Sequence, residues 1–301
     1  MISKLQKEIL EIKKGKTILA HSYVAEEIQE IADYVGDSFK LAQLAAKDKN
    51  DTLIMCGVHF MAETCKILAP EKKVMLVSAE AGCPMAEQIS QSELSALKEK
   101  HNDCAVMVYV NTTAALKELA DVCVTSSSAV EICRKIESKD ILFIPDCNLG
   151  RYVADKIPEK NFHFVNGGCP VHSAVTEQQV LKAKQLHPNS KLLVHPECIP
   201  EVCKYADYIG STSGIIDFAK KSSASEFIIG TEISIAEHLQ YVCPEKRFYP
   251  LSKHLICADM KAMTLVDVYN CLNGTSGIEI KMSPEQIKRA SVCIDKMLEL
   301  G

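Results

Sequence analysis

Three short apolar runs, each ending at a polar ring residue, recur along the chain at nearly equal intervals. With the residue that ends each one, they are 17–20 with His21, 105–108 with Tyr109 and 191–194 with His195. Each run precedes a segment with helical periodicity, at 25–35, 113–124 and 200–209. That segment leads into a short second strand. Continuous apolar runs are typical of buried parallel strands, and helical spacing predicts the covering helices.

Each copy continues with two more apolar runs separated by a helical segment. The third predicted strands cover 51–57, 141–146 and 226–232, and the fourth cover 72–78, 162–166 and 247–251. Strands that alternate with helices in this way predict α/β units with parallel sheets.

Four features recur at nearly fixed distances from His21, Tyr109 and His195. An Ala-Asp pair lies 11 residues on, a hydroxyl residue 17 on, Pro-Glu-Lys 49 on and a cysteine 60 to 62 on. The hydroxyl residues are Ser38, Ser126 and Thr212, and the cysteines are Cys83, Cys169 and Cys257. Four offsets kept in three copies indicate an internal triplication.

The repeats predict three small α/β domains, at 1–103, 104–190 and 191–301, with polar junctions between them. An amphipathic helix with Ile2, Leu5, Ile9 and Ile12 opens the first domain. A helix that begins at Ser283-Pro284 and stops at Gly301 closes the third. In α/β units, ligands bind beyond the carboxyl ends of the strands. If the three units surround a pseudo-threefold axis, their equivalent strand ends line one cavity.

The composition of the chain argues against several classes of protein. A net charge of −5 without a block of Lys and Arg argues against a nucleic-acid or anionic-membrane partner. The sequence has no apolar run of the roughly 18 residues that a membrane span needs, and its first residues lack the core of a signal peptide. We therefore expect a cytoplasmic protein.

The chain has fourteen cysteines and no CxxC pair, which excludes zinc-ribbon and ferredoxin-type motifs. Most of these thiols are expected to be small buried hydrophobes. Only Cys83, Cys169 and Cys257 share a position in the repeats. Three thiolates can hold three irons of a [4Fe–4S] cluster, which leaves the fourth iron to bind substrate oxygens. On spacing alone, a Cys₃ zinc site is the alternative.

The polar residues around the strand ends are candidates for substrate chemistry. Ser38, Ser126 and Thr212 are predicted N-caps, and three helix N-termini facing one cavity would favour a dicarboxylate or phosphate ester. Ordinary capping is the alternative. If the chain stays extended, residues two apart at each strand end point to one side, where His and Glu can move protons. These pairs are His21 with Tyr23, Tyr109 with Asn111 and His195 with Glu197, and His172 is a fourth candidate.

Several motifs together resemble one known family over nearly the whole length. They are LAHSY, ADYVGDSFKLA, CGVHFMAETCKIL, AGCPMAEQI, YVNTTAALKELADVCVTSSSA, PDCNLGRYVA, GGCPVH, VHPEC, GSTSG, GTEI and CADMKAMTL. By these motifs the chain is similar to the quinolinate synthases. Ser22 and Asp259 stand where that family often has Asn, and Pro170 stands at a variable position.

The resemblance implies three homologous three-layer α/β domains about a pseudo-threefold axis. It also implies one [4Fe–4S] cluster on Cys83, Cys169 and Cys257 with one open iron. The implied reaction condenses iminosuccinate with dihydroxyacetone phosphate to quinolinate, phosphate and water, for NAD biosynthesis. An L-aspartate oxidase or dehydrogenase would supply the imine. No nucleic-acid or membrane partner is implied.

The family's substrate-binding positions fall on His21, Ser38, Tyr109, Val110, Asn111, Ser126, His172, His195, Pro196, Glu197 and Thr212. The expected catalytic residues are Glu197, His195, Tyr23, His21 and Tyr109. We expect Glu197, oriented with His195, to move protons, and Tyr23 to assist isomerisation or phosphate loss. Two other readings stay open: a cluster-bearing redox protein on a triplicated scaffold, and a phosphosugar enzyme without metal.

Overall fold

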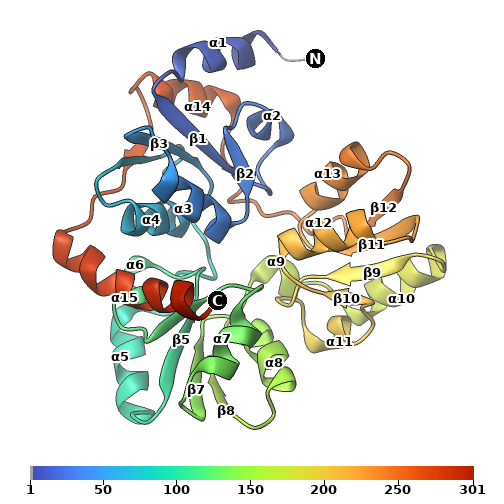
Figure 1. Ribbon diagram of the computed structural model, residues 1–301. Coiled ribbons are helices and arrows are strands. Elements are labelled where there is room, and N and C mark those ends of the chain that lie inside the picture. The colour runs from blue at the N-terminus through green and yellow to red at the C-terminus, as the bar shows by residue number, and fades with distance from the viewer. Residues whose placement is uncertain (1–2) are drawn as a thin grey trace. The chain divides into compact units, whose positions relative to one another are not determined.

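The computed structural model describes residues 3–301, so Ile2 of the predicted N-terminal helix lies outside the described residues. The chain divides into two compact units. Unit 1 holds the residues up to Cys83, Thr113–Glu118 and Cys257–Ser291. Unit 2 holds Pro84–Thr112, Leu119–Ile256 and Val292–Gly301. Each unit is an α/β structure in which helices lie beside parallel sheets (Figure 1).

Unit 1 contains one sheet with strand order β13-β4-β3-β1-β2. Its elements are α1 (Lys4–Ile12), β1 (Lys16–His21), α2 (Glu26–Gln29), β2 (Tyr34–Gly36), α3 (Ser38–Lys47), β3 (Thr52–Cys56), α4 (His59–Leu68), β4 (Lys73–Leu76), α6 (Ala114–Lys117), α14 (Leu265–Leu272) and β13 (Ile278–Glu279). Strands β1 to β4 are parallel, and β13 adds an antiparallel edge.

Unit 2 contains two four-stranded parallel sheets, in the orders β6-β5-β7-β8 and β10-β9-β11-β12. The first comprises α5 (Gln91–Lys100), β5 (Ala105–Tyr109), β6 (Val122–Val124), α7 (Ala129–Lys135), β7 (Asp140–Ile144), α8 (Cys147–Lys156), β8 (Asn161–Phe164) and α9 (Pro170–Ser173). The second comprises α10 (Glu177–Leu186), β9 (Lys191–Val194), α11 (Pro200–Cys203), β10 (Tyr208–Ile209), α12 (Thr212–Lys221), β11 (Glu226–Gly230), α13 (Ser234–Val242) and β12 (Arg247–Pro250).

The three sheets share one strand order: the second strand of each repeat, then its first, third and fourth. This confirms the predicted α/β class with parallel sheets. The C-terminal helix α15 (Pro284–Leu300) begins in unit 1 and ends in unit 2. Its first turn is capped by Ser283, whose Oγ accepts the Gln286 N–H at 3.1 Å, as the Ser-Pro start predicts.

The aspartate of each Ala-Asp pair fastens the edge strand to the first strand of its repeat. Its carboxylate accepts a backbone N–H near the start of the first strand, and its own N–H donates to the carbonyl of that same residue. The pairs are Asp33 with Ile18, Asp121 with Val106 and Asp207 with Leu192, at 2.8, 2.7 and 2.8 Å for the carboxylate bonds. These hydrogen bonds explain why the Ala-Asp pair recurs at the same distance in each repeat. The helices predicted before the pair are only single turns, α2, α6 and α11.

Replacing Asp207 with alanine is expected to lower the free energy of unfolding by about 1.5–3 kcal/mol, because the N–H of buried Leu192 loses its charged acceptor. Asp207→Asn keeps an acceptor oxygen and is expected to lose less than half of that. Urea unfolding followed by circular dichroism measures both variants. A loss below about 0.5 kcal/mol in Asp207→Ala would contradict the stabilising role of this hydrogen bond.

The lysine of each Pro-Glu-Lys turn stabilises the end of the helix that follows the second strand of its repeat. The Nζ atoms of Lys72, Lys160 and Lys246 donate to backbone carbonyls just beyond α3, α7 and α12 respectively, and Lys246 also reaches the last turn of α12. A helix C-terminus carries unpaired carbonyls and partial negative charge, so an ammonium group is favourable there. This recurring contact explains why the lysine of the tripeptide is present in all three copies.

In the first and third repeats the predicted N-caps are wrong by one residue, and in the second repeat α7 begins at Ala129, so Ser126 lies in the turn before that helix. The side chain at offset 16, and not the one at 17, accepts the N–H three residues on. Asp37 accepts from Lys40, Thr125 from Ser128 and Ser211 from Gly214, at 3.0, 3.2 and 3.2 Å. An N-cap must have extended backbone so that its side chain can turn back to the first turn, and Asp37 and Ser211 have that conformation. Ser38 and Thr212 are instead the first helical residues, and their hydroxyls are not the capping groups.

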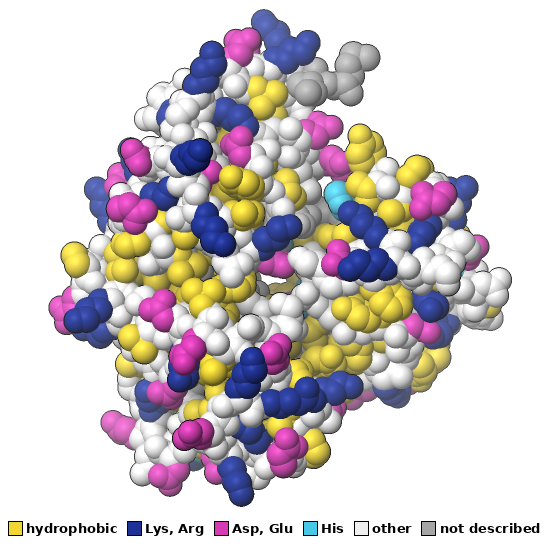
Figure 2. Space-filling view, in the orientation of Figure 1, with side chains coloured by type: hydrophobic (Ala, Val, Ile, Leu, Met, Phe, Trp, Pro, Cys, Tyr) yellow, Lys and Arg dark blue, Asp and Glu magenta, His cyan; other side chains and the backbone are white. Residues whose placement is uncertain are grey.

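Aliphatic side chains of the central strands, such as Ile18, Met107 and Leu193, are fully buried. Nine of the eleven cysteines outside the predicted ligand set are also buried, which confirms their expected packing role, whereas Cys83, Cys169 and Cys257 are half-buried. Among residues 3–301, no helix is both long and apolar enough to cross a membrane. On the face drawn in Figure 2, Lys and Arg side chains are intermixed with Asp and Glu.

Candidate functional site

In unit 2, polar side chains gather at the carboxyl ends of four parallel strands. Tyr109 is the last residue of β5, and His195 follows β9. Asp146 lies just beyond β7, and Thr231 directly follows β11. All four are buried. Strand ends of this kind are where α/β folds bind ligands, because the loops that follow are free of sheet pairing.

The carboxylate of Glu197 is the centre of this group, and only 4% of the residue is exposed. The Tyr109 hydroxyl donates to its Oε1 at 2.8 Å. On the other side, His172 Nδ1 lies 2.9 Å and His195 Nδ1 lies 3.8 Å from Oε2. The Asn148 amide donates to the Glu197 carbonyl at 3.1 Å. A buried carboxylate requires such partners, so the network fixes both its position and its charge.

The surroundings shift the pKa values of two buried carboxyl groups, Glu197 and Asp146, in opposite directions. Burial raises the pKa of Glu197, but His195, His172 and the hydrogen bonds from His172 and Tyr109 outweigh it, so the net pKa is lowered. Burial and the charge of Glu197 raise the pKa of Asp146. Burial and Glu197 also raise the pKa of Tyr109, which keeps its hydroxyl protonated. One carboxylate is thus ionised beside a neutral donor, an arrangement typical of acid–base sites.

Cys169 is fixed beside this network by its loop. Gln88 holds Gly168 from both sides, accepting its N–H at 2.8 Å and donating to its carbonyl at 2.6 Å. The Cys169 N–H donates to Asp146 at 3.0 Å, and the sulfur lies 3.2 Å from His172 Nδ1. Donor atoms of Cys169, His172 and Glu197 all lie within 4.8 Å of one another. The thiol is therefore part of the same site as the Glu197 carboxylate.

Gly167 has no space for a side chain: a Cβ there would lie 2.3 Å from Gln88 Oε1 and 2.7 Å from the Pro145 carbonyl oxygen. Gly167→Ala is expected to displace the loop and reduce any metal held through Cys169 by at least about half. The matched control is Gly168→Ala, whose nearest contact would be 3.2 Å. Metal analysis of both proteins tests this, and equal retention in the two would contradict it.

The strand ends in the first and third repeats do not stay extended, so that expectation is wrong. In both, the chain turns directly after the histidine, and the histidine Nδ1 accepts the backbone N–H two residues on. His21 accepts from Tyr23 at 3.1 Å, and His195 accepts from Glu197 at 3.3 Å. The rings of His21 and Tyr23 meet edge to face, with centroids 4.5 Å apart. The turn itself therefore brings the two side chains of each pair together.

Unit 1 holds a second group of the predicted residues. Lys261 Nζ donates to the Tyr23 carbonyl at 2.7 Å, and the Lys261 N–H donates to the Cys257 carbonyl at 3.1 Å. These bonds connect the Cys257 segment to the Tyr23 turn. Ser38 lies two residues beyond Gly36, which pairs with His21 in the sheet. Cys83 lies in the loop that follows β4.

The other predicted positions lie beside these. Ser126 hydrogen-bonds to the Tyr109 hydroxyl, which partly offsets the rise in the tyrosine pKa. Val110 is buried, and its N–H donates to the Val124 carbonyl at 2.8 Å. Asn111 is half-buried in the turn after β5, and Pro196 is buried between His195 and Glu197. In all, unit 2 groups Tyr109, Ser126, Cys169, His172, His195 and Glu197, and unit 1 groups His21, Tyr23 and Cys257.

Three residues of the unit 2 network are not predicted from the sequence: Asp146, Asn148 and Thr231. Thr231 Oγ1 lies 3.0 Å from His172 Nε2, so it orients the ring that contacts Glu197. Asp146 and Thr231 lie at the carboxyl ends of the predicted third strands 141–146 and 226–232, and Asn148 follows the first of these by two residues. That placement is the signal available in the sequence. Repeat matching failed because offset 37 is Val58, Asp146 and Glu232 in the three copies.

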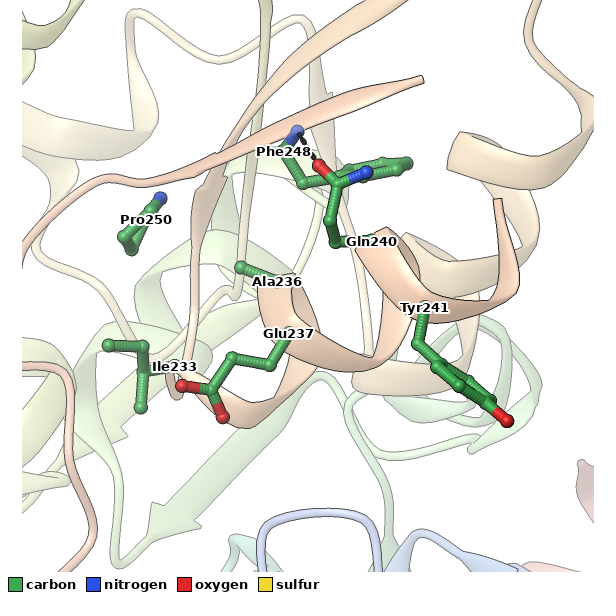
Figure 3. Close-up of a pocket in the computed structure, with 7 residues that line it drawn as sticks. All are labelled: Ile233, Ala236, Glu237, Gln240, Tyr241, Phe248 and Pro250. Carbon is green, nitrogen blue, oxygen red and sulfur yellow. Dashed lines mark hydrogen bonds between the residues drawn. The ribbon is translucent and has the colours of Figure 1, made fainter. Parts of the chain in front are cut away.

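A surface groove lies beside α13 and β12 (Figure 3), and its lining differs from that of the Glu197 site. Its volume is about 540 Å³, and apolar side chains such as Ile233 and Phe248 line it. Gln240 accepts the Phe248 N–H at 3.3 Å and so ties the edge strand to the helix. Among the described residues that line it, Glu237 is the only Asp, Glu, Lys, Arg or His. It has no group of acid and base side chains of the kind found around Glu197.

Comparison with known proteins identifies the family of the chain. Residues 2–299 match the family described as Quinolinate synthetase A protein. The chain is 47% identical over 302 aligned positions to the quinolinate synthase of Caldicellulosiruptor saccharolyticus, covering 100% of this chain and 99% of that protein. It is 46% identical over 298 positions to that of Methanoregula boonei, covering 98% of each chain. The chain therefore belongs to the quinolinate synthetase A family and is an enzyme.

Proposed function

We propose that this enzyme condenses iminosuccinate with dihydroxyacetone phosphate to form quinolinate, phosphate and water in NAD biosynthesis. The observation that carries the proposal is the buried Glu197 carboxylate with its Tyr109 and histidine partners. Condensation to an aromatic ring requires several proton transfers away from bulk water, and this network supplies ionised and neutral groups in contact. The names of the relatives support the same product.

We propose a [4Fe–4S] cluster as cofactor, held by Cys83, Cys169 and Cys257. The donor set fits, because thiolates are the usual ligands of such clusters and all three cysteines are half-buried, unlike most of the other thiols. When bound, a cluster with one iron free of protein ligands acts as a Lewis acid toward a leaving hydroxyl. We propose one cluster per chain.

In this proposal Glu197 takes protons from substrate carbon atoms and returns them to leaving oxygens. Its lowered pKa keeps it ionised at neutral pH, and His195 and His172 stabilise that charge. Tyr109 remains protonated and can donate to a developing substrate oxyanion. Asn148, through the Glu197 carbonyl, is a positioning residue.

The two substrates carry carboxylate and phosphate groups, which need cationic or N–H donors. Helices α3 and α12 are each ten residues long and begin at Ser38 and Thr212. Their first turns present backbone N–H groups and the positive end of the helix dipole. Because Asp37 and Ser211 do the capping, we propose that the hydroxyls of Ser38 and Thr212 bind substrate oxygens.

We further propose that the enzyme works in the cytoplasm, where reducing conditions keep its many thiols available as ligands. The imine substrate must come from an oxidation of aspartate, so an aspartate oxidase or dehydrogenase is the expected functional partner. The reaction does not require a stable complex between the two enzymes.

Tyr23→Phe is expected to slow quinolinate formation by about 10- to 100-fold, because it removes a hydroxyl that we place at isomerisation or phosphate loss. The ring contact with His21 is retained in this variant. Release of phosphate and of quinolinate should be measured separately in single-turnover reactions. The control is Tyr241→Phe, since Tyr241 is 76% exposed. Unchanged rates for Tyr23→Phe would remove the proposed role.

The function as a whole is tested by incubating oxygen-free, iron-loaded protein with both substrates. We expect quinolinate and phosphate to appear in equal amounts over many turnovers. Iron-loaded protein that forms neither product would contradict the proposal.

A further inference from the structure

We propose that His101, Cys104 and His163 of unit 2 form a separate zinc site. Their donor atoms all lie within 4.8 Å of one another. The rings of His101 and His163 have centroids 4.5 Å apart and are tilted by 40°. Cys104 is a half-buried free thiol. Two imidazole nitrogens and one thiolate are a donor set that suits Zn²⁺.

The local fold fixes this cluster. His101 is the C-cap of α5, and the Cys104 N–H donates to the His101 carbonyl at 3.0 Å, so one tight turn presents both side chains. Cys104 precedes Ala105, which pairs with Ile141, and His163 pairs with Leu142. This register places Cys104 and His163 on the same face of the sheet, since directly paired residues share a face and alternate residues repeat it.

A fourth ligand is also at hand. Asp140 Oδ1 lies 3.9 Å from His163 Nε2, and the Asn161 amide donates to the same oxygen at 3.1 Å. In a tetrahedral zinc site the donor atoms are about 3.3–3.7 Å apart, given bond lengths of about 2.0–2.3 Å. The half-buried side chains therefore need to close by only about 1 Å.

The cluster is distinct from the Glu197 site. Cys104 stands five residues before Tyr109, at the opposite end of β5, which at about 3.3 Å per residue separates them by about 16 Å. Zinc there would connect the turn after α5 to strand β8. We therefore expect a stabilising metal that takes no part in the condensation.

The test uses oxygen-free protein with its iron in place and Zn²⁺ alone as the added ligand. We expect the parent and Cys203→Ser, which removes another half-buried thiol, to bind one Zn²⁺ per chain without losing iron. Zinc-edge X-ray absorption should show one sulfur ligand at about 2.3 Å with nitrogen or oxygen ligands. Cys104→Ser and His163→Gln should each weaken binding by about 100-fold or more.

Thermal unfolding supplies an independent readout. Zinc should raise the midpoint of the parent and of Cys203→Ser, and should leave that of Cys104→Ser unchanged, because only a folded-state site stabilises by binding. Three results would overturn the proposal: no zinc retained by the parent, unaltered affinity in Cys104→Ser and His163→Gln, or zinc uptake matched by loss of iron. Zinc uptake matched by loss of iron would mean that zinc binds the thiols that hold the iron.

Discussion

Replacing Glu197 with glutamine is expected to lower the rate of quinolinate formation by about 10²–10⁴-fold while leaving the fold and the iron content unchanged. Glutamine keeps the volume and a carbonyl oxygen, so Tyr109 can still donate a hydrogen bond at that position. It removes the ionised group that His172 and His195 stabilise. Steady-state assays in the absence of oxygen measure the effect.

Two observations separate a catalytic effect from a structural one in this variant. The matched control is Glu201→Gln, on the exposed face of α11, which is expected to retain the parent rate. Because the charge of Glu197 raises the pKa of Asp146, that pKa should fall in Glu197→Gln. A carboxyl titration by infrared spectroscopy can follow it. A Glu197→Gln rate within twofold of the parent would remove Glu197 from the proposed mechanism.

Replacing any one of Cys83, Cys169 or Cys257 with serine is expected to reduce the iron from roughly four to less than about one per chain and to abolish turnover. A [4Fe–4S] cluster with three protein thiolates has no spare ligand, so the loss of one thiolate releases the cluster. Iron analysis and the visible spectrum of oxygen-free protein report this directly.

The control for these variants is Cys203→Ser, which removes a half-buried thiol that has no equivalent in the other repeats. It is expected to keep its iron and its activity. If one of the three variants retained the full iron content, a different set of ligands would have to hold the cluster.

Much of the fold could be predicted because buried parallel strands are continuous apolar runs, and triplication repeats the signal three times. The shared strand order of the three sheets confirms that interpretation. The aspartates of the Ala-Asp pairs show why the repeats persist: each makes the same pair of backbone hydrogen bonds, and nothing in the sequence alone reveals their geometry.

The errors have physical causes. Neighbouring residues such as Asp37 and Ser38 are both good caps by type, and only the backbone conformation decides which one caps the helix. The turn after His195 is set by its own Nδ1, which accepts the Glu197 N–H, and a strand pattern cannot show this. Asp146 was not identified because only two of the three equivalent positions carry a carboxylate, Asp146 and Glu232, while the third is the apolar Val58. Comparison of the repeats identifies residues that all three share, and it misses functional residues that only one repeat carries.

We propose that one cysteine from each repeat contributes to a single cluster. Iron and acid-labile sulfide analysis of oxygen-free parent protein tests it most directly. We expect about four of each per chain, with broad absorbance near ~400 nm. Colourless protein without iron, obtained under conditions that preserve such clusters, would contradict it.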